Sequence, residues 1–123
     1  MQSLRKAMSI TPDAIAWEHE HPDGTRSATL VGVREAGNIF TYAFYIPPNV
    51  WDAPHSHPTA SHLTVASGTL LLGYGPIMKP GAAVRHPAGS FLHVPAGAVH
   101  FDGADEETVI IGTAIGAWST DYV

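Results

Sequence analysis

Hydrophobic and polar residues alternate over short runs along this chain, and no long segment repeats its apolar residues at helical spacing. Successive side chains on a β-strand point to opposite faces, so this alternation, with its many β-branched and aromatic residues, predicts strands. Glycine, proline, asparagine and aspartate separate the runs and supply turn residues. The pattern predicts an all-β fold, a sandwich or barrel, with strands at 14–19, 27–35, 39–46, 53–57, 62–67, 69–74, 90–94 and 107–115.

Three parts of this pattern carry further expectations. The segment 75–87 is irregular and is expected to be a surface loop. In 39–46, one face carries Phe40, Tyr42, Phe44 and Ile46 and is expected in the core, with Tyr42 also a candidate for lining a pocket. The runs 69–74 and 107–115 are apolar on both faces, more than one small barrel can bury, which predicts a homodimer.

Composition limits the class of protein. A chain of 123 residues supports one hydrophobic core and so one domain. Six basic residues stand against eleven acidic ones, for a net charge of −5 with no basic run, so neither nucleic acid nor an anionic membrane is an expected partner. No run of about 18 apolar residues is present, and the first residues lack the apolar core of a signal peptide, so a cytoplasmic protein is expected.

Histidines cluster in the stretch APHSHPTASHLTVASG. His55 and His57 are two residues apart and face the same side of a strand. His62 follows at an odd offset, and the turn expected around Pro58 is needed to bring it to the same side. Three imidazoles in an apolar interior are costly to bury without an ion that uses their lone pairs. The stretch predicts a divalent metal site, and the absence of cysteine restricts its ligands to nitrogen and oxygen.

A second stretch, GSFLHVPAGAVH, places Gly89, Pro95, Gly97 and His100 at fixed spacing. Together, the two stretches resemble the two signature motifs of the cupin superfamily. The resemblance implies a single-domain jelly-roll β-barrel that is commonly dimeric and holds one metal ion per chain. It implies His55, His57, His62 and His100 as the metal ligands, with His62 in the place of the usual glutamate.

The resemblance also divides the chain. It covers residues 38–115 as the barrel, assigns residues 1–37 to N-terminal strands that complete the barrel and contribute to a dimer contact, and leaves 116–123 as a C-terminal tail.

Four neutral imidazoles leave two open positions on a six-coordinate ion, which suits a metalloenzyme acting on a small molecule. We expect a non-haem iron dioxygenase for a small carbonyl or aromatic compound, because no certain carboxylate base is visible in the sequence. The alternatives are a redox-neutral zinc, nickel or manganese lyase, isomerase or cyclase, and a non-enzymatic ligand-binding or sensing module. His93 and Tyr42 are the candidate catalytic side chains, His93 as a general base or as a hydrogen-bond partner of a ligand.

Overall fold

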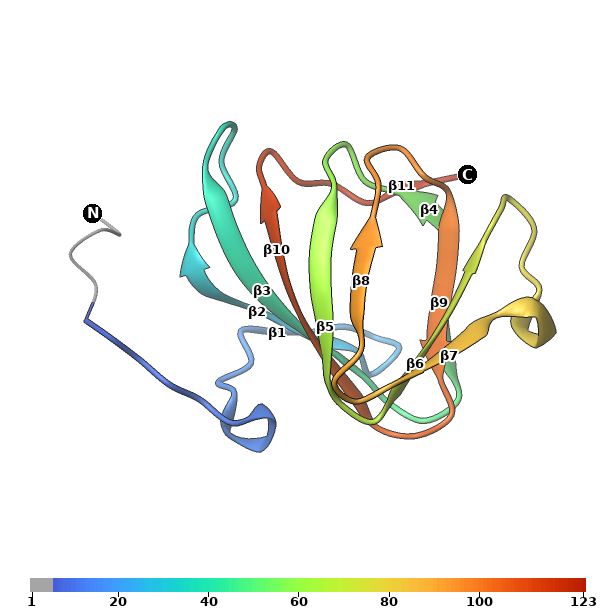
Figure 1. Ribbon diagram of the computed structural model, residues 1–123, viewed down its shortest axis with the longest axis horizontal. Coiled ribbons are helices and arrows are strands. Elements are labelled where there is room, and N and C mark those ends of the chain that lie inside the picture. Colours follow the sequence, from blue (N-terminus) through green and yellow to red (C-terminus); the bar gives the residue numbers. More distant parts are fainter. Residues whose placement is uncertain (1–5) are drawn as a thin grey trace.

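Two antiparallel β-sheets lie face to face in the computed structural model, which describes residues 6–123 (Figure 1). No helix in this range is long and apolar enough to cross a membrane. The elements are η2 (Pro12–Ala14), β1 (His19–Glu20), β2 (Arg26–Gly32), β3 (Ile39–Ile46), β4 (Val50–Ser56), β5 (Ser61–Ser67), β6 (Thr69–Tyr74), η3 (Pro80–Ala82), β7 (Val84–Pro87), β8 (Phe91–Val94), β9 (His100–Ala104), β10 (Thr108–Ile115) and β11 (Asp121–Tyr122).

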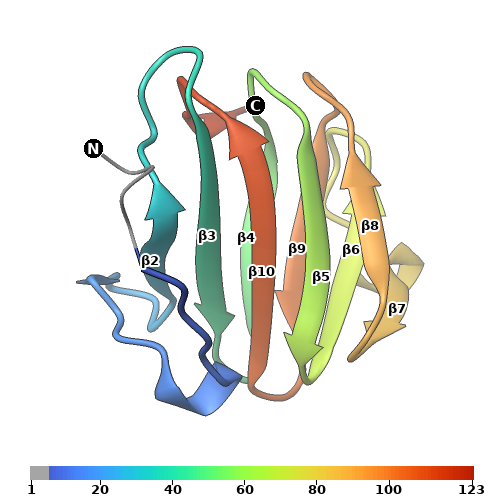
Figure 2. The ribbon, with the colours of Figure 1, turned by 60° about the vertical axis from the view of Figure 1, so that its left-hand side comes forward.

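The strands are interleaved in the manner of a jelly roll. The six-stranded sheet has the order β1-β2-β3-β10-β5-β8 and the five-stranded sheet the order β11-β4-β9-β6-β7. Figure 2 shows the six-stranded sheet in front of the other. The strand orders mean that the chain crosses repeatedly between the two layers. The all-β prediction is confirmed. Within residues 6–123 the hydrogen bonds form two separate sheets, so the jelly roll is a sandwich here and not a closed barrel.

Most of the expected strands are present. The strands predicted at 39–46 and 69–74 have those bounds, and three others differ by one residue at one end (β5, β8 and β10). The strand at 27–35 shifts to Arg26–Gly32, and the strand at 53–57 begins earlier, at Val50. Alternation and turn residues were therefore sufficient to place most of the sheet.

Two expectations about the chain's path were wrong, and the C-terminal segment holds a short strand as well. Residues 14–18 are not strand: the chain makes a 3₁₀ turn at η2 and pairs only at β1. The loop expected at 75–87 contains η3 and the edge strand β7, which pairs with β6. The tail expected at 116–123 contains β11, which pairs with β4 through Asp121 and Tyr122. Each of these is short or lies at a sheet edge, where tertiary pairing outweighs local pattern.

The main core lies between the sheets. The aromatic face of β3 points inward as expected, with Tyr42 and Phe44 packed against the buried cluster. The cluster also includes residues from both layers: Ile46, Leu63, Val65, Leu70, Leu72, Leu92, Val94, Ala104 and Ile110. It occupies the space between the sheets beside the cavity described below, because Leu63, Val94 and Ile110 also line that cavity.

A second cluster covers the outer face of the six-stranded sheet. Ile15, from the N-terminal segment, is buried with Ala28, Ala43 and Val109, and Trp17 packs against them. The chain thus covers part of the second apolar face of β10 by itself. The two-sided apolar pattern does not require a second subunit, and the homodimer stays a prediction.

Glycines provide room where aromatic rings lie flat on the five-stranded sheet. Gly73 is paired with Phe101, and a Cβ at position 73 would collide with the ring of this buried phenylalanine. Replacing Gly73 with alanine should lower the free energy of unfolding by about 1–3 kcal/mol, since the ring must move in a packed environment. Chemical denaturation measures the change. Gly81→Ala is the matched control, because nothing lies within 4 Å of a Cβ there, and equal effects would contradict the packing argument.

Candidate metal centre

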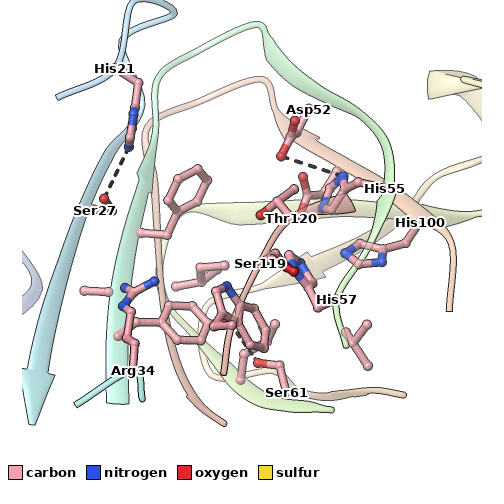
Figure 3. Close-up of a pocket in the computed structure, with 18 residues that line it drawn as sticks. His21, Ser27, Arg34, Asp52, His55, His57, Ser61, His100, Ser119 and Thr120 are labelled. Atoms are coloured by element: carbon pink, nitrogen blue, oxygen red, sulfur yellow. Dashed lines mark hydrogen bonds and ion pairs between the residues drawn. The ribbon is translucent and has the colours of Figure 1, made fainter. Parts of the chain in front are cut away.

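Three histidines meet at one end of the sandwich. His55 lies near the end of β4, His57 just beyond it, and His100 begins β9 directly opposite His55. One ring nitrogen from each lies within 4.8 Å of the others. The ring centroids of His55 and His100 are 4.3 Å apart, and His55 and His100 are both buried. Figure 3 shows the three rings gathered at one side of a cavity.

Backbone carbonyl groups determine which nitrogen of each of the three rings carries a proton. The Nδ1 atoms of His55, His57 and His100 lie 2.6, 2.8 and 2.9 Å from the carbonyl oxygens of Ala53, Ser119 and Ala98. A carbonyl oxygen only accepts hydrogen bonds, so each Nδ1 must carry the proton and donate it. Each Nε2 then keeps a lone pair, which is the arrangement of metal-binding histidines with an oriented second nitrogen. The donor set therefore fits a divalent metal ion.

The surroundings of His57 and His100 favour their neutral forms. Burial is the main cause that lowers the pKa of His100 to about 4. His55 and His57 add to this shift, and the hydrogen bond that His100 donates to the Ala98 carbonyl opposes it. Burial also lowers the pKa of His57, opposed by its bond to Ser119. At neutral pH the Nε2 atoms of His57 and His100 are therefore free of the proton that would compete with a metal ion.

The two sequence motifs meet through the backbone. The turn at Pro95–Gly97 precedes His100, and the Gly97 N–H donates to the carbonyl oxygen of His57 at 2.9 Å. Gly97 has a φ of +74°, which other residues adopt only with strain. Asn49 takes up a left-handed conformation as well, with a φ of 63°. The glycine of the second motif thus ties the His100 turn to the first motif.

His62 and His93 lie elsewhere. β5 begins at Ser61, whose buried side chain points inward, so alternation sends His62 to the outer face. There it stands opposite His93 on β8, with ring centroids 5.0 Å apart, and both side chains are exposed. The turn after Pro58 restarts the strand one residue earlier than expected. The structure accordingly brings together three of the four expected ligands, and His93 is not among the residues that line their cavity.

Two carboxylates that sequence reasoning passed over share the site. Asp52 on β4 and Asp102 on β9 are register partners, and both lie near His55. Asp52 Oδ2 is 3.7 Å from His55 Nδ1, and its Oδ1 accepts a hydrogen bond from Tyr122 at 2.7 Å. Burial raises the pKa of Asp102 to about 7, with His55 opposing and Asp52 adding to the shift.

The sequence held a signal for only one of these carboxylates. Asp102 is two residues after His100 on the same strand and therefore shares its face. Asp52 is at an odd offset from His55, and the register shift between them, a bulge in the pairing of β4 with β9, brings both to the same face.

Tyr42 reaches the same cavity from the opposite sheet. Its hydroxyl group and that of Ser61 lie 2.7 Å apart. Burial raises the pKa of Tyr42 to about 12, so the hydroxyl keeps its proton at neutral pH. Its ring lies over Gly112, the partner residue on β10, where a Cβ would collide with it. The structure thus places this candidate catalytic residue in the cavity with the histidine cluster.

The cavity has a volume of about 380 Å³, enough for a small organic molecule. The C-terminal segment forms one wall, where Trp118 stacks on His57 with 4.2 Å between ring centroids and 17° between planes. The other lining residues come from both sheets and the N-terminal region: His21, Ser27, Arg34, Tyr42, Ala43, Phe44, Asp52, His55, Ser61, Leu63, Val94, His100, Asp102, Ile110, Ser119 and Thr120. The segment expected to be a tail is therefore part of the site.

The interleaved antiparallel sheets with a histidine cluster at one end define the cupin type of fold, the double-stranded β-helix. The resemblance noted in the sequence is confirmed at this level. Neither a protein-family profile nor a curated protein matches the chain.

Solved structures with the same fold include several cupins. A cupin-like protein from Thermotoga maritima msb8 is 25% identical, with a TM-score of 0.65 over 80% of this chain and 75% of its own. The polyketide cyclase RemF from Streptomyces resistomycificus is 18% identical, with a TM-score of 0.73 over 96% of this chain and 86% of its own. The DMSP lyase DddQ from Ruegeria pomeroyi DSS-3 is 17% identical, with a TM-score of 0.61 over 75% of this chain and 47% of its own. These similarities concern the fold.

The position of each histidine predicts its effect on metal binding. His57→Ala and His100→Ala should each lose most of the bound metal, because each removes one of three converging nitrogens. His62→Ala should retain it, because the side chain lies on the outer face. Elemental mass spectrometry of untagged protein, reconstituted with Zn²⁺ and dialysed, measures the content. If His62→Ala lost metal as completely as His57→Ala, the assignment of the ligands would be wrong.

Proposed function

We propose that this protein is an enzyme that holds one divalent metal ion with His55, His57 and His100 and catalyses a redox-neutral reaction on a small organic molecule. The reaction class is that of a lyase, isomerase or cyclase, in which a proton moves between carbon and oxygen. The observation that carries the proposal is that proton-transfer groups, Asp102 and Tyr42, line the same cavity as the histidine cluster. A module that only binds a ligand has no need of this combination.

A bound divalent ion would polarise a carbonyl or enolate oxygen of the substrate as a Lewis acid. The residues of the chain supply the rest. Asp102 lies on the metal side of the cavity, where its carboxylate can take a proton from a carbon next to that oxygen. Tyr42 keeps its hydroxyl proton and can donate it from the other sheet, held in position by Ser61. The ring of Trp118 and the apolar side chains of the core limit the entry of water.

This proposal departs from the iron dioxygenase expected from the sequence. That preference depended on open positions for substrate and dioxygen and on the lack of a visible carboxylate base, and Asp52 and Asp102 remove the second ground. Three imidazoles suit iron as well as zinc, nickel or manganese, so the ligands do not select the reaction. The names of the similar structures, a polyketide cyclase and a DMSP lyase, are those of proteins in the proposed classes and support it by analogy of fold.

Deuterium exchange tests the proposed proton transfer without the natural substrate. Protein loaded with Zn²⁺, Mn²⁺ or Ni²⁺ is incubated in D₂O with small ketones and keto acids such as levulinate, and NMR follows loss of the C–H signals next to the carbonyl group. We expect exchange well above that of the free metal ion. Asp102→Asn should lower the enzymatic rate by about 100-fold, the usual range for removing a general base.

Asp105→Asn is the matched control, since Asp105 is exposed and paired with Arg85 outside the cavity. It should leave the exchange rate unchanged. Oxygen uptake by the iron-loaded protein with the same compounds, in the absence of metal-dependent exchange, would favour the dioxygenase and contradict the proposal. Exchange that is equal in the wild type and in Asp102→Asn would exclude Asp102 as the base.

The hydroxyl group of Tyr42 gives a second test. Tyr42→Phe keeps the ring that packs against Trp118 and removes only the proton donor. We expect the exchange rate to fall by about 100-fold, at the low end of the usual range for acid–base catalysis, while the metal content stays that of the wild type. The exchange rate of Ser61→Ala should fall less, because the Tyr42 hydroxyl group remains as the proton donor. If Tyr42→Phe exchanges as fast as the wild type, the hydroxyl has no part in proton transfer.

A further inference from the structure

Arg34 stands at an exposed edge of the cavity, in the connection between β2 and β3. It is the only lysine or arginine among the cavity-lining residues that the structure describes. Figure 3 shows it across the cavity from His57 and His100. Arg34 is thus a cation at the end opposite the histidines, and the proposed proton transfer gives it no role.

The side chain of Arg34 is held in place by its neighbours. Its Nε donates to Thr29 Oγ1 at 2.9 Å, and its guanidinium carbon lies 5.0 Å from the centre of the Phe40 ring and 5.9 Å from that of Tyr42. Contact with aromatic faces orients the planar group without using its terminal nitrogens. The structure gives these terminal nitrogens no hydrogen bond or ion pair within residues 6–123.

The acidic side chains nearest Arg34 form no ion pair with its guanidinium within residues 6–123. Burial lowers the pKa of Arg34, opposed by Tyr42 and Glu18. The Oε1 atom of Glu18 accepts a hydrogen bond from the Thr29 backbone N–H at 2.8 Å. Asp52 and Asp102 lie at the other end of the cavity, close to His55. The guanidinium thus has free donors suited to an anion in the cavity.

A row of aromatic rings connects Arg34 to the histidine cluster. Tyr42 contacts Trp118 with 5.8 Å between ring centroids, and Trp118 stacks on His57. These rings touch one another, so a substrate lies along the row and not between its members. Phe44 and Ile110 contribute further apolar surface. The cavity therefore has a polar group at each end and an apolar wall along its length.

From this arrangement we infer that Arg34 binds the carboxylate of a substrate whose flat, apolar body lies along Tyr42 and Trp118 and whose opposite end reaches His55, His57 and His100. The inference rests on the proposed function and adds to it the class of substrate, an organic carboxylate with a separate oxygen function for the metal. A guanidinium can donate two parallel hydrogen bonds to a carboxylate and distinguishes it from a neutral group of the same shape. Arg34 is in this view a specificity residue, remote from the reacting atoms.

A pair of matched probes tests the inference. Hydroxamates bind divalent metal ions, so 4-carboxybenzohydroxamate and its naphthalene homologue carry a metal-binding group at one end and a carboxylate at the other. The corresponding carboxamides are neutral probes of nearly the same shape. Calorimetric titration of Zn²⁺-loaded protein with both members of each pair gives the preference for the carboxylate.

We expect the wild-type protein to bind the better carboxylate probe at least 10-fold more tightly than its carboxamide. Arg34→Gln should abolish this preference and leave the affinity for the carboxamide unchanged, whereas Arg34→Lys should keep part of it. Arg85→Gln is the matched control, because Arg85 pairs with Asp105 outside the cavity, and it should keep the full preference. Raising the ionic strength should weaken the preference only in proteins with a cation at position 34.

The possible failures are distinct. If both carboxylate probes bind no better than their carboxamides in the wild type, or if Arg34→Gln keeps the preference, the carboxylate subsite is overturned while the metal site stands. If no hydroxamate binds the Zn²⁺-loaded protein, or binding persists unchanged in His57→Ala, the metal site itself fails and the inference falls with it.

Discussion

The hydrogen bonds from three imidazole Nδ1 atoms to backbone carbonyl oxygens determine how the histidine rings are oriented at the metal end of the cavity. Two of the carbonyls, of Ala53 and Ala98, belong to residues two positions before the histidines that they bind, and the third, of Ser119, comes from the C-terminal segment. Because the backbone supplies the acceptors, the ring orientations follow from the path of the chain. The fold therefore prepares three lone pairs before any ion is bound.

The pairing of β4 with β9 determines which other groups join the cluster. Regular alternation along β9 places Asp102 on the face of His100, and the bulge in β4 adds Asp52 to the face of His55. Two carboxylates thus lie beside three imidazoles in a partly buried place, where negative charge is costly unless a cation is close. A divalent ion would meet this need, so the carboxylates and the imidazoles favour the same occupant.

The C-terminal segment and the connection between β2 and β3 complete the cavity that the central strands begin. The N-terminal segment packs against the outer face of the six-stranded sheet through Ile15 and Trp17, and the following β2–β3 connection supplies Arg34. The C-terminal segment crosses above the sheets, where Trp118 covers His57 and β11 joins β4. The nitrogens for an ion come from β4, from His57 just after it and from β9, with Ser119 orienting His57. A site for a substrate also needs Arg34 and Trp118 from the flanking segments.

The sequence by itself determined the all-β class, most strands and three metal-ligand candidates. The reason is that side-chain alternation and fixed turns act locally: His55 and His57 share a face, and the turn at Pro95–Gly97 leads into β9 at His100. Tertiary structure decided the rest. Whether His62 or Ser61 faces inward depends on where β5 begins, and a shift of one residue exchanges the two faces. Asp52, Arg34 and Trp118 reach the cavity through a bulge and through contacts between distant segments, and such contacts leave no periodic signal in the chain.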